Sequence, residues 1–281
     1  MKEFFITATD TDAGKTFVSC ALIKALTQNF TKGFTKDICE GLTEEKAPVQ
    51  KVAAFKPIAA GCELVNGQLI NEDAKLLSDF ANCGQSITDI NPIAFAEPIA
   101  PHIAAKKQNK HITLTEVSDH YQQVKSLNAD FTLVEGAGGW RLPLGHTSLL
   151  PAEMKASFTG NSKAVSQKPS YHFLSDFVKL ADLTVILIVN MKLGCLNHAL
   201  LTYEAIIADG VNCVAWIANS ASSEQMNNLA ENIAELEQIL PIAKIAQFDF
   251  FASIDEEGKE ITFDEKINLA AQKIDLAPLL D

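Results

Sequence analysis

Apolar residues follow two alternating patterns along the chain. Short continuous runs rich in Val, Ile and Phe are typical of strands buried on both faces, and they occupy residues 4–7, 52–55, 131–134, 184–189 and 213–218. Segments with apolar residues at helical spacing follow at 16–27, 72–81, 114–127, 197–208 and 224–239, and another helix is expected near 263–274. This alternation predicts an α/β fold of three layers, with a mainly parallel sheet between helices.

Two stretches interrupt the alternation, at residues 31–50 and 145–171. Neither has a steady period, and the second is rich in Ser, Lys and Thr, so we expect both to be surface loops or lids. A chain of 281 residues that is 47% hydrophobic can bury one large core. We therefore expect a single domain over residues 1–281, with these two stretches as insertions.

The formal net charge of -12 argues against nucleic acid and anionic membranes as partners, because both require clustered Lys and Arg. No run approaches the roughly 20 apolar residues of a membrane span, and the N-terminal apolar stretch is too short for a signal peptide. The six cysteines are scattered without a C-x-x-C pair, which indicates neither a disulfide framework nor a zinc site. We expect a cytoplasmic protein.

Residues 9–16, T-D-T-D-A-G-K-T, connect the first predicted strand to the first predicted helix. In a phosphate-binding P-loop the backbone N–H groups of such a turn surround the phosphates, Lys15 neutralises the β and γ oxygens, and the Thr16 hydroxyl binds Mg²⁺. Thr9 stands where the pattern has its first glycine, so an ordinary turn with a surface lysine is the alternative. The strand and helix on either side favour a P-loop NTPase-type fold. The expected nucleotide contacts are Asp12, Ala13, Gly14, Lys15, Thr16 and Phe17.

Two acidic residues are candidates to complete the Mg²⁺ site with Thr16, because Mg²⁺ takes oxygen ligands. Asp73 lies at the start of a predicted helix, where N-capping is the alternative role. Glu135 follows a strand, at the edge of the sheet where ligands bind in α/β folds. The segment after it, Gly136, Ala137 and Gly138, allows close approach of a nucleotide, with a plain tight turn as the alternative.

Lys56 ends the second predicted strand and would therefore meet Lys15 at the same edge, where a fixed cation can stabilise developing charge. A solvated surface lysine is the alternative. Asp10 and Asp12 would repel a triphosphate. A cationic co-substrate such as an amine would explain one of them, and simple exposure to solvent is the other explanation.

Seven segments, in order, resemble the dethiobiotin synthetase family. They are 9–16 (TDTDAGKT), 55–57 (FKP), 91–92 (NP), 95–98 (FAEP) with 101–102 (PH), 134–140 (VEGAGGW), 192–199 (KLGCLNHA) and 216–219 (WIAN). The resemblance implies a cyclo-ligase that uses ATP, Mg²⁺ and CO2 to close a ureido ring on 7,8-diaminononanoate, yielding dethiobiotin, ADP and phosphate in biotin biosynthesis. One amine takes up CO2 as a carbamate, the γ-phosphoryl group activates it, and the second amine closes the ring.

The resemblance also assigns roles to individual residues. It makes Lys56, Lys15 and Thr11 catalytic, places Thr11 and Asp12 beside the diamine, and has Asn219 bind the adenine edge. It implies a homodimer, because the loop at residues 192–197 reaches the substrate site of a partner subunit. The substrate contacts it implies are Thr11, Lys56, Ala60, Pro98, Lys192, Gly194, Cys195 and Asn197. For the Cys195 side chain itself, burial as a small apolar residue remains the favoured interpretation.

The chain departs from the family at three positions. The family commonly has glycine where Ala8 stands, a hydroxyl residue where Ala60 stands and an aspartate where Ser220 stands. Ala8 and Ala60 suggest a catalytically weakened homologue as one alternative. A P-loop switch ATPase that positions partner proteins is the other, because a fold alone does not determine function.

Overall fold

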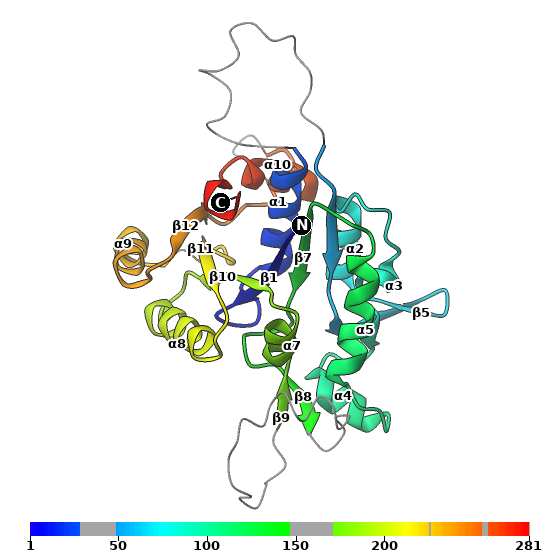
Figure 1. Cartoon of the computed structure of the whole chain (residues 1–281). Helices are drawn as coiled ribbons and strands as arrows, with labels where there is room; N and C mark the ends of the chain where they lie inside the picture. The colour runs from blue at the N-terminus through cyan, green and yellow to red at the C-terminus, as the bar shows by residue number, and fades with distance from the viewer. Residues whose placement is uncertain (29–48, 147–170, 225, 255–257, 281) are drawn as a thin grey trace, which may run out of the picture.

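The computed structural model describes residues 1–28, 49–146, 171–224, 226–254 and 258–280. Its centre is a six-stranded sheet with the order β12-β11-β10-β1-β7-β2, in which all neighbouring strands are parallel (Figure 1). The strands are β1 (Lys2–Ala8), β2 (Val52–Phe55), β7 (Phe131–Glu135), β10 (Thr184–Asn190), β11 (Cys213–Asn219) and β12 (Ala243–Phe248). The predicted three-layer α/β fold and all five predicted strands are confirmed.

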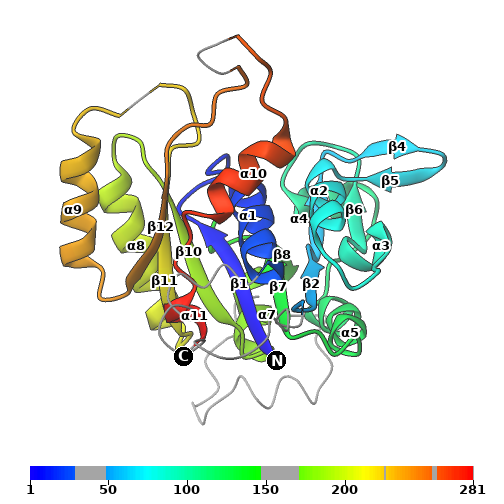
Figure 2. The ribbon, with the colours of Figure 1, turned by 90° about the horizontal axis from the view of Figure 1, so that it is seen from above.

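Helices cover both faces of this sheet. One hydrophobic core joins one face to α1 (Lys15–Thr27), α2 (Glu72–Phe80) and α10 (Phe263–Ala271). Figure 2 shows α1 and α10 side by side over this face. The second core joins the opposite face to α5 (Leu114–Lys125), α7 (Leu174–Leu180), α8 (Cys195–Ala208) and α9 (Leu229–Ile239). Helix α1 is apolar on nearly all sides because α2 and α10 cover the surface that the sheet leaves.

Shorter elements complete the fold. A parallel pair is formed by β3 (Ile58–Ala60) and β6 (Ile93–Phe95), and two antiparallel pairs by β4 (Glu63–Val65) with β5 (Gln68–Ile70) and β8 (Pro143–His146) with β9 (Tyr171–Phe173). The short helices are α3 (Ile87–Ile90), α4 (Pro101–Lys107) and α11 (Ala277–Leu280). Most of the two predicted insertions, at 31–50 and 145–171, lies outside the described residues. The single-domain assignment stays a prediction.

Three sequence predictions need correction. The last central strand, β12, was missed because it is an edge strand in which exposed polar residues interrupt the apolar run. Helix α9 begins at Leu229 rather than at 224, because Asn228 before it adopts a left-handed conformation. Helix α8 begins at Cys195 rather than at 197, directly after Gly194, whose φ is 94°. Among the described residues, no helix is long and apolar enough to cross a membrane.

Candidate active site

The loop between β1 and α1 reverses the chain through two left-handed residues, Asp12 with φ 59° and Gly14 with φ 77°. A Cβ atom on Gly14 would lie 2.4 Å from the amide nitrogen of Asn219, so only glycine fits at this position. Helix α1 begins immediately afterwards, and its first N–H groups face the loop. The backbone therefore has the strand, loop and helix arrangement that binds phosphate.

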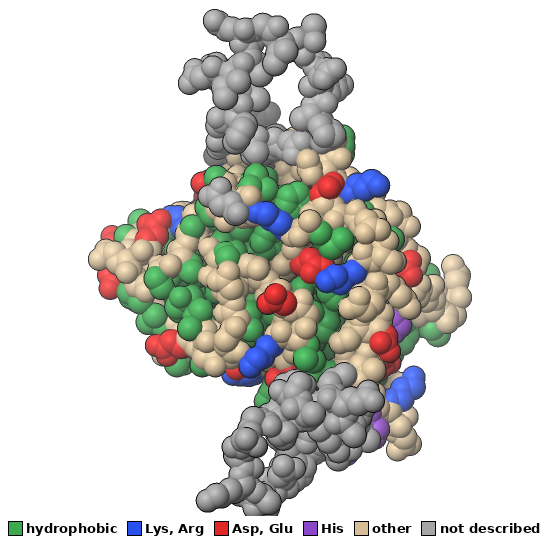
Figure 3. All heavy atoms as spheres, viewed as in Figure 1, with side chains coloured by type: hydrophobic (Ala, Val, Ile, Leu, Met, Phe, Trp, Pro, Cys, Tyr) green, Lys and Arg blue, Asp and Glu red, His purple; other side chains and the backbone are tan. Residues whose placement is uncertain are grey.

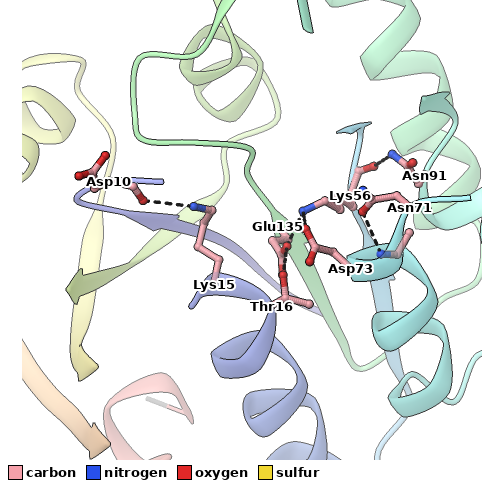
Figure 4. Close-up of polar contacts among 9 residues, drawn as sticks. Asp10, Lys15, Thr16, Lys56, Asn71, Asp73, Asn91 and Glu135 are labelled. Carbon is pink, nitrogen blue, oxygen red and sulfur yellow. Dashed lines mark hydrogen bonds and ion pairs between the residues drawn. The ribbon is translucent and has the colours of Figure 1, made fainter. Parts of the chain in front are cut away.

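Lys15 is nearly buried, with 9% of its surface exposed. Within the described part of the chain its ammonium group has one long hydrogen bond, of 3.4 Å, to the carbonyl oxygen of Asp10 (Figure 4). Burial holds the pKa of Lys15 below its ordinary value despite the attraction of Glu135. A phosphate bound to the loop would supply the anionic partner that the buried ammonium group lacks.

Lys56, Glu135, Asp73 and Thr16 form a connected polar cluster beside the loop (Figure 4). Lys56 Nζ lies 2.6 Å from Glu135 Oε1 and 2.8 Å from Asp73 Oδ2. The Thr16 hydroxyl donates to the same Glu135 oxygen at 3.0 Å. Burial disfavours the Lys56 charge, but the two carboxylates outweigh it and raise the pKa of Lys56. Burial likewise opposes the charge of Asp73, and Lys56 outweighs it, so the pKa of Asp73 is lowered.

This cluster borders a pocket of about 900 Å³ at the carboxyl edge of the sheet. Residues expected in the site that line it are Thr11, Asp12, Gly14, Lys15, Thr16, Phe17, Lys56, Ala60, Asp73, Pro98, Ala137 and Gly138. An apolar part of the lining was not predicted from the sequence; it is formed by Ala59, Ile99, Ala100, Pro101 and Leu142. The apolar run Pro-Ile-Ala-Pro at 98–101 was the available signal. The pocket thus combines charged side chains of both signs with an apolar wall.

Three expected nucleotide contacts lie behind this surface. Glu135 is 1% exposed, and its Oε2 atom has no hydrogen-bond partner among the described residues. Gly136 packs on β1, where a Cβ would lie 2.8 Å from the Phe5 ring, so sheet packing alone requires glycine here. Ala13 is buried, and its carbonyl oxygen accepts a hydrogen bond from Asn219 at 2.8 Å.

The oxygen atoms of Thr16, Asp73 and Glu135 suit a hard divalent cation. Mg²⁺ in nucleotide sites uses one or two carboxylates together with phosphates and water. Buried carboxylate oxygens are normally hydrogen-bonded, but Glu135 Oε2 has no partner among the described residues. A bound cation would be such a partner. The donor set therefore fits Mg²⁺.

A smaller pocket of about 190 Å³ adjoins the first and shares Gly14, Phe17 and Ala221 with it. Its walls are largely aromatic, formed by Phe17, Phe250, Phe251 and Phe263, and Asn219 also lines it. The rings of Phe17 and Phe251 lie 5.2 Å apart. Among these aromatic residues only Phe17 was predicted from the sequence. The Phe-rich segment at 248–251 was the available signal. It begins at the last residue of β12, the strand that was not predicted.

The loop at 192–197 is not among the residues that line either described pocket. Lys192 pairs with Asp10 at 2.8 Å, and this hydrogen bond holds the pKa of Asp10 below its ordinary value. Leu193 is 93% exposed, and Asn197 is exposed as well. Cys195 is buried, and its N–H donates to the Lys192 carbonyl oxygen at 2.9 Å. The Cys195 side chain is a packing residue at the start of α8, which follows the left-handed Gly194.

Comparisons with known proteins add sequence relatives and a fold relative. A family model described as an AAA domain matches residues 2–156 and 159–257. The ATP-dependent dethiobiotin synthetase BioD of Alteromonas mediterranea is 39% identical over 259 residues, covering 91% of this chain and 95% of the relative. The enzyme of the same name from Pseudoalteromonas translucida is 40% identical over 246 residues, covering 88% and 89%.

Among solved structures, the MinC:MinD cell division protein complex of Aquifex aeolicus aligns with a TM-score of 0.51 at 12% identity. The alignment covers 100% of this chain and 96% of that chain. At this identity the likeness concerns the fold alone.

Proposed function

The chain belongs to the ATP-dependent dethiobiotin synthetase family, and we propose that it closes the ureido ring of dethiobiotin from 7,8-diaminononanoate, CO2 and ATP. The observation that carries this proposal is the meeting of Lys15 and Lys56 with Thr16, Asp73 and Glu135 around one large pocket. Two ammonium groups at one end suit a transferred phosphoryl group, and the apolar wall suits an aliphatic chain.

ATP would extend across both pockets. Its phosphates would lie on the N-terminus of α1 with Lys15 at the β and γ oxygens. Its base would enter the smaller pocket between aromatic side chains, next to Asn219. Because the Asn219 nitrogen already donates to the Ala13 carbonyl oxygen, the amide oxygen is the atom left to accept from an exocyclic amino group. Ala137 and Gly138, which line the larger pocket, would border the other side of the phosphate site.

Mg²⁺ would be held by Thr16, Asp73 and Glu135 and would neutralise charge on the triphosphate. The Lys56 ammonium group contacts one carboxylate oxygen of Glu135 and one of Asp73. Its ammonium group is therefore held at the position where the carboxylates, the metal and the γ-phosphoryl group would meet. The Lys56 side chain would bind the oxygens of the carbamate and of the phosphoryl group as charge moves between them.

The diamine would lie along Thr11, Ala60 and Pro98, with the Asp12 carboxylate near an amine. Nitrogen of one amine attacks CO2 and loses a proton to give a carbamate. A carbamate oxygen then takes the γ-phosphoryl group from ATP and releases ADP. The second amine attacks the activated carbon, phosphate leaves, and the ring closes with loss of a proton. The protein supplies orientation and fixed positive charge in this scheme.

We also propose a homodimer, in which residues Lys192, Gly194, Cys195 and Asn197 of one subunit border the substrate site of the other. The exposure of Leu193 supports it. So does an apolar surface over α8 and α9, where hydrophobic side chains gather (Figure 3). Helix α8 also carries the exposed Leu201 and Ile207. The same view shows basic side chains scattered among acidic ones. Consumption of ATP supports a cytoplasmic location.

The test is ADP release measured with and without the diamine and bicarbonate, together with dethiobiotin formation. We expect ADP release to depend on both substrates and to match dethiobiotin one to one. ADP release independent of the diamine would instead indicate a switch ATPase. Diamine and ATP binding without product would indicate a weakened homologue, and Ala60→Ser would then be the variant expected to restore turnover.

A further inference from the structure

Among the described residues, strand β2 lies at the edge of the central sheet and has a strand partner, β7, on one side only. Alternate residues of a strand direct their backbone N–H and C=O groups to the same side. Lys51 faces β7, because its carbonyl oxygen accepts from the Phe131 N–H at 3.1 Å. The groups of Val52, Ala54 and Lys56 consequently face the open edge, where unpaired backbone groups require other partners.

Side-chain amides from the segment after α2 supply most of these partners. Asn82 Oδ1 accepts from the Val52 N–H at 2.7 Å, and the backbone N–H of Asn82 donates to the Val52 carbonyl oxygen at 3.2 Å. The Gln85 side chain makes two hydrogen bonds to the Ala54 backbone. Its Oε1 accepts from the Ala54 N–H at 2.9 Å, and its Nε2 donates to the Ala54 carbonyl oxygen at 2.8 Å. These contacts satisfy the edge of β2 without a further strand.

The last pair of contacts in this series is on Lys56. Its N–H donates to the Ile90 carbonyl oxygen at 2.7 Å, and its carbonyl oxygen accepts from Asn91 Nδ2 at 2.7 Å (Figure 4). The register of β2 with β7 ends at the pair Phe55 and Val134, so the sheet no longer holds Lys56. Residues 90 and 91 therefore fix the peptide from which the Lys56 side chain extends.

Asn91 is itself held firmly and is 4% exposed. Its N–H donates to the Ile87 carbonyl oxygen at 2.7 Å, at the end of α3, while its Oδ1 is buried without a partner among the described residues. An apolar residue of similar size would remove that unpaired oxygen, so packing alone does not favour an asparagine here. The amide nitrogen that contacts Lys56 is the group that asparagine contributes.

We propose that Asn91 is a positioning residue that acts through Lys56, by fixing the Lys56 peptide so that its ammonium group meets Glu135, Asp73 and the transferred phosphoryl group. This inference rests on the proposed role of Lys56 in the ligase reaction. A small displacement of a catalytic group lowers turnover strongly, whereas nucleotide binding, which depends on the phosphate loop, changes little.

The experiment compares Asn91→Ala with Gln85→Ala, each in the wild-type and in a Lys56→Met background, by kcat, ATP affinity and melting temperature. Gln85→Ala is the matched control, because it removes two hydrogen bonds from the same strand edge but leaves both contacts to Lys56 intact. We expect Asn91→Ala to lower kcat about 10- to 100-fold with ATP affinity retained, and Gln85→Ala to lower stability with kcat nearly unchanged.

In the Lys56→Met background, Asn91→Ala should cause no further loss of kcat, because the group that it positions is gone. Equal losses of kcat from the two single variants, or the same loss from Asn91→Ala in both backgrounds, would overturn the inference. If Asn91→Ala does not fold, Asn91→Leu, which keeps a similar volume and removes the donor without adding a buried charge, replaces it in the same comparison. Normal turnover of Lys56→Met would refute the role of Lys56 itself, which separates failure of the proposed function from failure of this inference.

Discussion

Replacing Lys56 by methionine tests the centre of the site, because the substitution removes the ammonium group and keeps most of the side-chain volume. Lys56 Nζ is the hydrogen-bonding partner of two carboxylates, at 2.6 Å from Glu135 and 2.8 Å from Asp73. Glu135 is almost fully buried, whereas the side chain of Asp73 is 41% exposed. Loss of the ammonium group thus leaves one buried carboxylate without its main counter-charge.

The substitution should lower both the stability of the protein and its turnover. Breaking a buried ion pair costs about 3–5 kcal/mol, and we expect the lower end, about 3 kcal/mol, because Asp73 is solvated and Lys15 still attracts Glu135. For a chain of this size this lowers the melting temperature by roughly 6 °C. Removal of a fixed charge that acts on the transferred group lowers kcat by about 10²-fold or more. ATP affinity should fall less, since Lys15 and the α1 N-terminus are retained.

The assay is steady-state ADP release with diamine and bicarbonate, combined with ATP titration by calorimetry and thermal melting with and without Mg²⁺. We expect Mg²⁺ with ATP to stabilise Lys56→Met slightly less than the wild type, because stabilisation by a ligand follows its affinity. Near-normal kcat would remove Lys56 from the mechanism. A melting temperature equal to that of the wild type would refute the assignment of a buried ion pair.

Three further predictions concern the metal, the pH dependence and the loop. Glu135→Gln should raise the Mg²⁺ concentration needed for half-maximal turnover about 10-fold, and an unchanged metal titration would assign Glu135 a structural role. Burial holds the pKa of Lys15 below 10.5, so ATP affinity should be constant while Lys15 is charged and fall as pH rises through that lowered pKa. Lys15→Arg should move this fall in ATP affinity to higher pH. Lys56 cannot cause the fall, because the pKa of Lys56 is raised. An identical pH profile in Lys15→Arg would contradict the assignment of the fall to Lys15. Gly14→Ala should weaken ATP binding and cost more stability than Gly210→Ala, because Gly210 has a similar φ of 74° but open space around it. The two losses of unfolding free energy are expected to differ by about 1 kcal/mol or more. Equal losses would show that the contact with Asn219 is relieved without cost.

The sequence alone determined the type of fold and the chemistry of the phosphate end of the site. Continuous apolar strands and the turn at residues 9–16 show up locally, because burial on both faces and a strand-to-helix turn each leave a pattern within a few residues. Lys56 and Glu135 could be placed at one edge because both directly follow or end parallel strands, and the carboxyl ends of such strands meet. The order of seven short segments predicted the family, and with it the roles of the remaining site residues.

Only the tertiary structure decided how those groups are held. The pairing of Lys56 with Glu135 joins positions 79 residues apart, and the contact of Asn91 with Lys56 joins two loops through one side-chain amide. The aromatic pocket at Phe251 and Phe263 and the position of Asn219 against Gly14 likewise arise from packing between distant segments. A sequence pattern records which face of an element is buried, but not which distant side chain covers it, because that choice is made by the packing of the whole chain.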